Sequence, residues 1–365
     1  MVLLHSTARF SRKTRDESLN VNLFGRSAVA GICVMITTMR VAVCWVLLIF
    51  RPMPKSISAQ QAMGMILSLQ TSFVKGLERV SDDVQFTKKS WLRDEGQHGG
   101  GSRYSTGDND FFDRASVNVS QINYDDLPEK KLASATALST IIHPRNPRAP
   151  SMHMHISWTE MKGEGSEPGR GYWRMMADLN PSIENSDDTA AFVECLKNVA
   201  PSQYDEASSQ GDRYFYIPAL ERHRGVAHFY LENYSSDDPS ADMDLAKAMG
   251  AAVIDCYLTI LGQRMTGCDE VSESDAAAQL AYHSLYFFQV LTLDRGTTSG
   301  LLVHDENDVG IMGSLPSHVD KALLASWRER LPTPQNRLLD RVLEALPDGE
   351  TSLVDSDVKI TVASA

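Results

Sequence analysis

Short strand-like runs framed by two helical segments constrain most strongly what this chain can fold into. Residues 59–80 and 243–261 place apolar side chains at helical spacing, so each segment predicts an amphipathic helix. Apolar or alternating runs separated by turn-forming residues predict strands at 115–122, 137–143, 153–161, 214–218, 226–232 and 286–293. Helices early and late around many strands indicate a large sheet covered by helices.

The N-terminal segment differs from the rest of the chain in charge. Its first 55 residues carry eight Lys and Arg against two acidic residues, whereas the whole chain has 35 against 47. Residues 28–50 are apolar except for Arg40, as in a membrane span or an organelle-targeting segment, and Met53 is an alternative true start. We therefore predict an extension at residues 1–55, one domain at 56–350 and a C-terminal tail at 351–365.

The composition excludes several classes of protein. A net charge of −12 argues against a nucleic-acid groove, and 42% hydrophobic with 22% charged residues is typical of a soluble globular protein. The five cysteines have neither disulfide-framework nor zinc-site spacing, which favours a reducing compartment. We expect a cytoplasmic protein, with a mitochondrial location as the alternative and membrane contact only if the extension is retained.

Three consecutive glycines precede one of the arginines. Residues 99–101, followed by Ser102 and Arg103, could hold a phosphate, but no complete P-loop or dinucleotide fingerprint accompanies them. The prediction is a tight turn beside a substrate.

Histidines, prolines and arginines are densest from Ile141 onward. Three prolines within residues 144–150 hold the backbone extended and lead into a strand on which His153 and His155 share one face. These two histidines could bind a metal with His143, could place a proton donor beside a buried substrate, or could be hydrogen-bonded within the sheet. Because guanidinium groups pair with carboxylates, nearby arginines favour an anionic substrate; they are Arg148, Arg174, Arg222 and Arg224.

Seven segments between about Ser56 and Pro347 follow one another in a distinctive order. They are SWLRDEGQHGGGSR, ASVNVSQI, HPRNPRAPSMHMHISW, YWRMMADLNP, DRYFYIPALERHRGV, DRGTTSGL and IMGSLPS. This order resembles the oxygen-dependent coproporphyrinogen III oxidases. The resemblance implies an α+β fold, with an antiparallel sheet of about seven strands flanked by helices, in a homodimer. It also implies that dioxygen converts two propionates of coproporphyrinogen III to vinyls in heme biosynthesis, with no metal or organic cofactor.

The same resemblance implies roles for individual residues. Asp178 in ADLNP matches the D-L-T-P aspartate, which faces the pyrrole N–H groups and could accept a proton to leave an anion that reacts with dioxygen. His153 matches the proton-donor histidine, Arg224 matches the arginine of the R-G-I-G-G motif, and the D-R-G-T motif is intact. The expected substrate-binding residues are Ser139, His155, Arg174, Arg224, Asp294 and Arg295.

Two arginines of the family are missing here. Where relatives have H-x-N-x-R, this chain ends the motif at Ser157, and the family's G-G-R falls on residues 305–307. A substrate with four carboxylates still needs cations. We therefore expect Arg174, on the same segment as Asp178, to replace a lost propionate contact.

These losses leave two other interpretations open. A divergent member could bind a carboxylated tetrapyrrole without turnover, or could oxidise a different porphyrinogen. A metal-dependent oxygenase could instead use His143, His153 and His155. Of the four histidines assigned to metal in some bacterial members, two fall here on Val193 and Ala219, so no metal is expected. Retention of the predicted base and proton donor favours the active oxidase.

Overall fold

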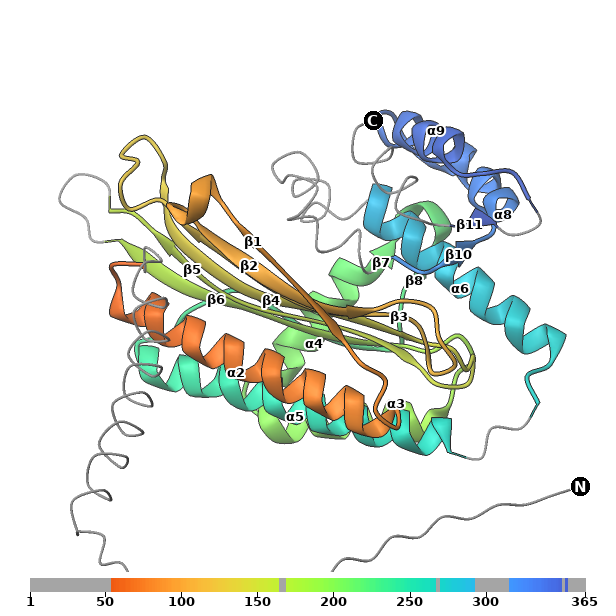
Figure 1. Ribbon diagram of the computed structural model, residues 1–365, viewed down its shortest axis with the longest axis horizontal. Coiled ribbons are helices and arrows are strands. Elements are labelled where there is room, and N and C mark those ends of the chain that lie inside the picture. The colour runs from red at the N-terminus through yellow and green to blue at the C-terminus, as the bar shows by residue number, and fades with distance from the viewer. Residues whose placement is uncertain (1–53, 164–168, 267–269, 293–314, 350–351, 354–365) are drawn as a thin grey trace, which may run out of the picture. The chain divides into compact units, whose positions relative to one another are not determined.

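A seven-stranded sheet organises the chain. The computed structural model describes residues 54–163, 169–266, 270–292, 315–349 and 352–353. The strand order is β1-β2-β3-β4-β5-β6-β9, and each neighbouring pair is antiparallel (Figure 1). The strands are β1 (Thr87–Leu92), β2 (Gly99–Thr106), β3 (Phe112–Asn123), β4 (Leu132–Pro144), β5 (Ser151–Met161), β6 (Arg170–Asn180) and β9 (Ala227–Tyr234). The predicted α+β fold with one large antiparallel sheet is confirmed.

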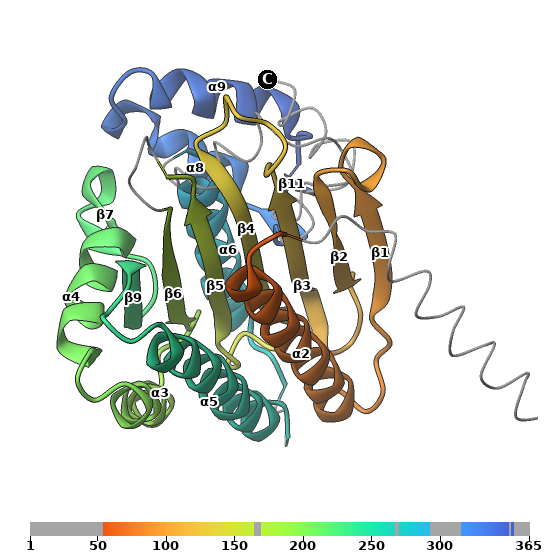
Figure 2. The ribbon, with the colours of Figure 1, turned by 90° about the vertical axis from the view of Figure 1, so that its left-hand side faces the viewer.

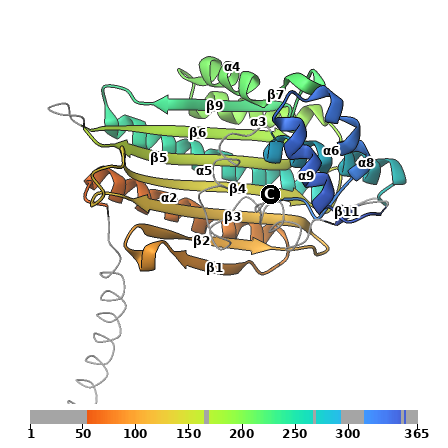
Figure 3. The ribbon, with the colours of Figure 1, turned by 90° about the horizontal axis from the view of Figure 1, so that it is seen from above.

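Helices lie on both sides of this sheet. They are α2 (Ile57–Val80), α3 (Ser186–Val199), α4 (Tyr204–Phe215), α5 (Pro239–Met265), α6 (Glu273–Thr292), α8 (Lys321–Ser326) and α9 (Gln335–Ala345). Helices α2 and α5 run side by side under one face (Figure 2), whereas α6, α8 and α9 lie over one end of the other face (Figure 3). Short strands β7 (Tyr216–Ile217) and β8 (Arg222–His223) pair with each other, as do β10 (His318–Val319) and β11 (Ser352–Leu353).

The period-two alternation of β5 decides which side chains meet the helices. Met152, Met154 and Ile156 are buried in the main core with α2 and α5. The intervening side chains, including His153 and His155, therefore face the opposite side of the sheet. This second side, which we call the site face, is the one on which α6 packs over Ile141 of β4.

The two predicted helices are confirmed and extend slightly further than the sequence indicated. Helix α2 begins after Ser56, whose hydroxyl accepts a hydrogen bond from the Ala59 amide, and α5 begins after Asp238, which caps it in the same way, with Pro239 at its first position.

Among the described residues, α5 alone has the length and hydropathy of a membrane span, and 44% of that window is buried inside the protein. It is a core helix, packed against α2, α3 and the sheet. The apolar segment at residues 28–50 lies outside the described residues.

Three local predictions were wrong. The described part of the predicted strand at 286–293, residues 286–292, is the last part of α6, where every residue from Tyr282 to Thr292 is buried, so no amphipathic period distinguishes helix from strand. The predicted strand at 214–218 is mostly the end of α4 followed by the two residues of β7. The glycines at 99–101 do not form a turn but begin β2, where Gly99 and Gly100 have positive φ and lie against neighbouring backbones.

Candidate active site

Strand register brings several predicted residues together on the site face. His153 of β5 is the direct neighbour of Asp178 on β6, and Asp178 is in turn the neighbour of His228 on β9. Two residues further along β5, His155 is the direct neighbour of Ser139 on β4. Because directly opposed residues in an antiparallel sheet point to the same face, these side chains form two adjacent rows across the strands.

Asp178 is the centre of a buried hydrogen-bond network. Its Oδ1 accepts from His153 Nδ1 at 2.9 Å, and its Oδ2 accepts from an Arg224 guanidinium nitrogen at 2.9 Å. Asn180 Nδ2 donates a third hydrogen bond to Oδ2 at 2.6 Å. The Asp178 side chain is 0% exposed, whereas that of His153 is 15% exposed, so the histidine is the more accessible member of the pair.

The network holds Asp178 in its ionised form. Burial by itself would raise the pKa of this carboxyl, but the Arg224 guanidinium, the His153 ring and the Asn180 amide outweigh it. The pKa of Asp178 therefore lies well below its usual range. A carboxylate in this state accepts hydrogen bonds well and is a weak base.

Arg224 forms a buried ion pair with Asp178. We expected it to bind a propionate, but its side chain is 3% exposed and ion-pairs with Asp178. The guanidinium carbon lies 4.8 Å from the ring centre of Phe215 on α4 and 5.0 Å from that of Tyr286 on α6. Without substrate, this arginine therefore binds a carboxylate of the protein itself, that of Asp178.

Helix α6 contributes an aromatic wall beside the network. The Tyr286 ring packs edge-on against His143 at 4.8 Å, and His143 Nδ1 lies 3.0 Å from the Ser151 hydroxyl. Burial raises the pKa of Tyr282 and lowers the pKa of its neighbour His283 to about 4. Both side chains are therefore neutral near pH 7, so these two α6 residues add aromatic surface but no charge.

Arg174 lies on the site face, and its Cα partner on β5 is Ser157. Ser157 is the position at which an arginine is predicted to be missing, so Arg174 stands on the neighbouring strand beside that position. Its guanidinium donates to Glu232 Oε1 at 2.8 Å, and the two side chains are 36% and 46% exposed. An ion pair this exposed contributes about 0–1 kcal/mol, so a carboxylate that binds on this face can compete for the arginine.

Two predicted substrate-binding residues, Asp294 and Arg295, lie outside the described part of the chain. Residues 305–307, where an arginine of the family is missing, lie outside it as well. Within the described ranges, no group of three or more His, Cys, Asp or Glu side chains is arranged to hold a metal ion.

Three members of the site were not predicted from the sequence: Asn180, His228 and Asp212. Asn180 follows Asp178 by two residues, and that spacing on one strand could have indicated a partner on the same face. His228 hydrogen-bonds to the Arg224 carbonyl and to Asp212 of α4. No local pattern predicted this contact, because it joins a helix, a turn and a strand.

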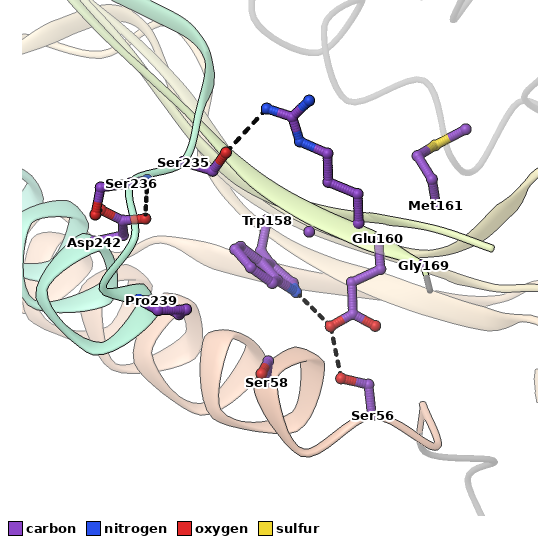
Figure 4. Close-up of a pocket in the computed structure, with 12 residues that line it drawn as sticks. Ser56, Ser58, Trp158, Glu160, Met161, Gly169, Ser235, Ser236, Pro239 and Asp242 are labelled. Carbon is purple, nitrogen blue, oxygen red and sulfur yellow. Dashed lines mark hydrogen bonds between the residues drawn. The ribbon is translucent and has the colours of Figure 1, made fainter. Parts of the chain in front are cut away.

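A cavity of about 590 Å³ lies elsewhere, between the N-terminal ends of α2 and α5 and the ends of β5 and β6. Figure 4 shows Glu160 in it, accepting hydrogen bonds from Trp158 Nε1 at 2.9 Å and from the Ser56 hydroxyl at 2.6 Å. Trp158 belongs to the core under α2 and α5, so this cavity opens on the face opposite Asp178.

Comparison with known proteins places the chain in a family. The sequence model of the coproporphyrinogen III oxidase family matches residues 61–344. The chain belongs to the coproporphyrinogen III oxidase family. Two similar proteins are the oxygen-dependent coproporphyrinogen-III oxidases, mitochondrial, of Rattus norvegicus and Mus musculus, which are 26% and 27% identical to it. Each match covers 77% of this chain and 66% of the relative, so the matched region spans slightly less than two thirds of the relatives' length.

Proposed function

We propose that this family member is an oxygen-dependent coproporphyrinogen III oxidase of heme biosynthesis. In this reaction each of two propionates loses carbon dioxide and the equivalent of a hydride to become a vinyl group. One dioxygen per propionate takes up that hydride equivalent and a proton to become hydrogen peroxide. The observation that carries the proposal is the buried Asp178 carboxylate held between His153 and Arg224 on the site face. The family match and the names of the relatives support the substrate and the oxidant.

Asp178 would accept the pyrrole N–H of the substrate once one of its present donors leaves. Both of its oxygens are occupied at rest, Oδ1 by His153 and Oδ2 by Arg224 and Asn180. Arg224 is the donor that a substrate propionate attracts, because it alone carries a permanent positive charge. Its departure would raise the pKa of Asp178, since burial would then act unopposed by the guanidinium. Substrate binding would thus convert a weak base into a stronger one.

The remaining residues would bind and protonate the substrate. His153 would act as proton donor from its partly exposed position beside Asp178. Arg174 lies four residues from Asp178 along β6, roughly 13 Å at strand spacing, and would bind a propionate far from the nitrogen centre. Ser139 of β4 and His155 of β5 are register partners. They lie on the site face as well and would contact the substrate from these two strands.

Several further properties belong to the same proposal. We propose that no resident metal or organic cofactor takes part and that the protein is a homodimer, which analytical ultracentrifugation can test. We favour the mitochondrion over the expected cytoplasm, because the relatives' names give that location and the first 55 residues, with eight basic and two acidic side chains, have the composition of a targeting segment. Fractionation of cells that express a C-terminally tagged chain would test the location.

The test is incubation of the purified protein with chemically reduced coproporphyrinogen III in air, followed by reoxidation and chromatography of the products. Protoporphyrin that forms in air, does not form without oxygen and is unaffected by a chelator is the expected result. Substrate binding without product would favour the second candidate, a tetrapyrrole-binding protein, which the loss of arginine at Ser157 supports. Activity abolished by a chelator would contradict the metal-free reaction.

A further inference from the structure

We propose that His228, held by Asp212, is a positioning residue that acts as an imidazolium to fix the Arg224 turn against Asp178. The kinetic part of its test rests on the proposed function, whereas the spectroscopic part does not. His228 Nδ1 lies 2.8 Å from Asp212 Oδ1, and its Nε2 lies 2.8 Å from the Arg224 carbonyl oxygen. One imidazole therefore joins α4, β9 and the turn that carries the arginine.

The two partners of His228 are both hydrogen-bond acceptors. A backbone carbonyl and an ionised carboxylate both only accept hydrogen bonds, and a neutral imidazole has a single N–H. Both hydrogen bonds form together only when both ring nitrogens carry protons. The other charged or titratable groups around His228 are His223 of β8, whose ring is 5.6 Å away, Arg224 itself, and its register neighbour Asp178.

The hydrogen bond to the carbonyl fixes the backbone from which the guanidinium extends. The Arg224 amide also donates to the Phe215 carbonyl at 3.0 Å, so both polar groups of this peptide segment are anchored. Gly225 follows with a φ of +76°, and a Cβ there would lie 2.9 Å from the Leu179 carbonyl oxygen and 3.1 Å from His228 Nε2. The turn therefore passes tightly over the end of β6. A fixed backbone leaves the long side chain free to exchange Asp178 for a propionate and to return.

Two consecutive residues of α4, Gly211 and Asp212, make room for His228 and bind it. A Cβ at Gly211 of α4 would lie 2.6 Å from the His228 Cβ, so the glycine lets the helix approach β9 at this point. The next residue is Asp212, which supplies the carboxylate. The family motif R-G-I-G-G reads R-G-V-A-H at residues 224–228, so the histidine stands where the motif has glycine. Gly211, Asp212 and His228 form one structural unit.

The kinetic test compares His228→Ala and His228→Gln with wild type and with the control His223→Ala, a nearby exposed histidine. His228→Ala should lower kcat/KM on the order of 10- to 100-fold, because a displaced Arg224 guanidinium is no longer positioned to bind Asp178 or a substrate propionate. The pH dependence of kcat/KM reports the ionisation of groups in the free enzyme. In His228→Ala the ion pair between Arg224 and Asp178 should weaken and the pKa of Asp178 should rise, so the acid limb of the kcat/KM profile should move to higher pH. His228→Gln, whose amide can donate to the carbonyl, should recover part of the loss, and His223→Ala should stay within about twofold of wild type.

Two outcomes would overturn the proposal: kinetics of His228→Ala close to those of wild type, or a fall in kcat/KM with an unmoved acid limb, which marks a merely structural role. Nitrogen-15 NMR of histidine-labelled protein provides a readout without turnover. A signal with both ring nitrogens protonated near pH 7 that disappears in His228→Ala is the expected result, and a neutral His228 ring would refute the inference. If wild type shows this signal but makes no protoporphyrin, the proposed function fails and the positioning role of His228 stands.

Discussion

Replacing Arg224 by methionine should strongly destabilise the folded chain near neutral pH. Methionine keeps an unbranched apolar chain between the rings of Phe215 and Tyr286 but removes the cation that faces Asp178. Removal of one partner of a buried ion pair costs about 3–5 kcal/mol, because the remaining charge stays in a region of low dielectric. With the Asp178 side chain at 0% and the Arg224 side chain at 3% exposure, solvent can do little to reduce that cost.

The cost should depend on pH in a defined direction. In wild type the pKa of Asp178 lies below its unfolded value of about 3.9, so its stabilisation is complete above that pH and is lost as pH falls through the folded pKa. In Arg224→Met the burial of Asp178 is opposed only by His153 and Asn180, so its pKa should rise. To the extent that it rises above the unfolded value, the variant loses stability as pH increases from the unfolded pKa to the raised one. The difference in unfolding free energy between the two proteins should therefore be larger at pH 7.5 than at pH 4.5.

Urea unfolding followed by circular dichroism at both pH values measures these differences. Asp178→Asn and the double variant complete a mutant cycle. Because the double variant removes both charges, it should be more stable than the sum of the single effects predicts, by on the order of 3 kcal/mol. Additive effects within about 1 kcal/mol, or a cost that does not change with pH, would refute the electrostatic account of this pair.

Three further predictions follow from single contacts. Asp178→Asn should lower kcat by about 10²- to 10⁴-fold in the protoporphyrin assay, as loss of a general base does, and a fall of less than tenfold would argue against that role. Arg174→Ala should raise KM for coproporphyrinogen III several-fold with little change in kcat, whereas Glu232→Gln, which releases Arg174 from its ion pair, should not raise KM. Gly101→Ala should destabilise the chain by about 1–3 kcal/mol in urea unfolding, because its Cβ would overlap the Trp91 ring and the Val119 carbonyl oxygen. The matched control Gly64→Ala, in open space on α2, should stabilise by about 0.5–1 kcal/mol, and equal effects of the two changes would contradict the packing argument.

The part of the fold that sequence predicted is the part with a clear period. The runs at 115–122, 137–143, 153–161 and 226–232 lie within or overlap β3, β4, β5 and β9, since these strands are rich in β-branched and aromatic residues or alternate regularly. Strand β6 was missed as a strand, although its Asp178 was identified, because Met175, Met176 and Ala177 in its middle are neither β-branched nor aromatic. Strands β1 and β2 were missed for similar reasons: one carries edge lysines and the other opens with three glycines.

The site itself divides along the same line. Residues that share a strand face, such as His153 and His155, could be grouped from the alternation alone. Their partners on other elements could not, since the distance in sequence from Asp178 to Arg224 and from Asp212 to His228 carries no periodic signal. The resemblance pointed to Arg224 as a substrate contact, but only the packed structure reveals that Asp178 occupies it first.

This order of partners has a consequence for how such a site could discriminate between substrates. If Arg224 must leave Asp178 before a pyrrole N–H can take its place, then a tetrapyrrole without a carboxylate near the arginine meets an aspartate whose pKa is still depressed. Binding energy from the propionate would then be used to create the base, rather than to hold the substrate more tightly. Arg174 differs in this respect: its exposed Glu232 pair competes weakly, and its release changes no buried charge. The two arginines should therefore separate kinetically, with Arg224 governing turnover and Arg174 governing affinity.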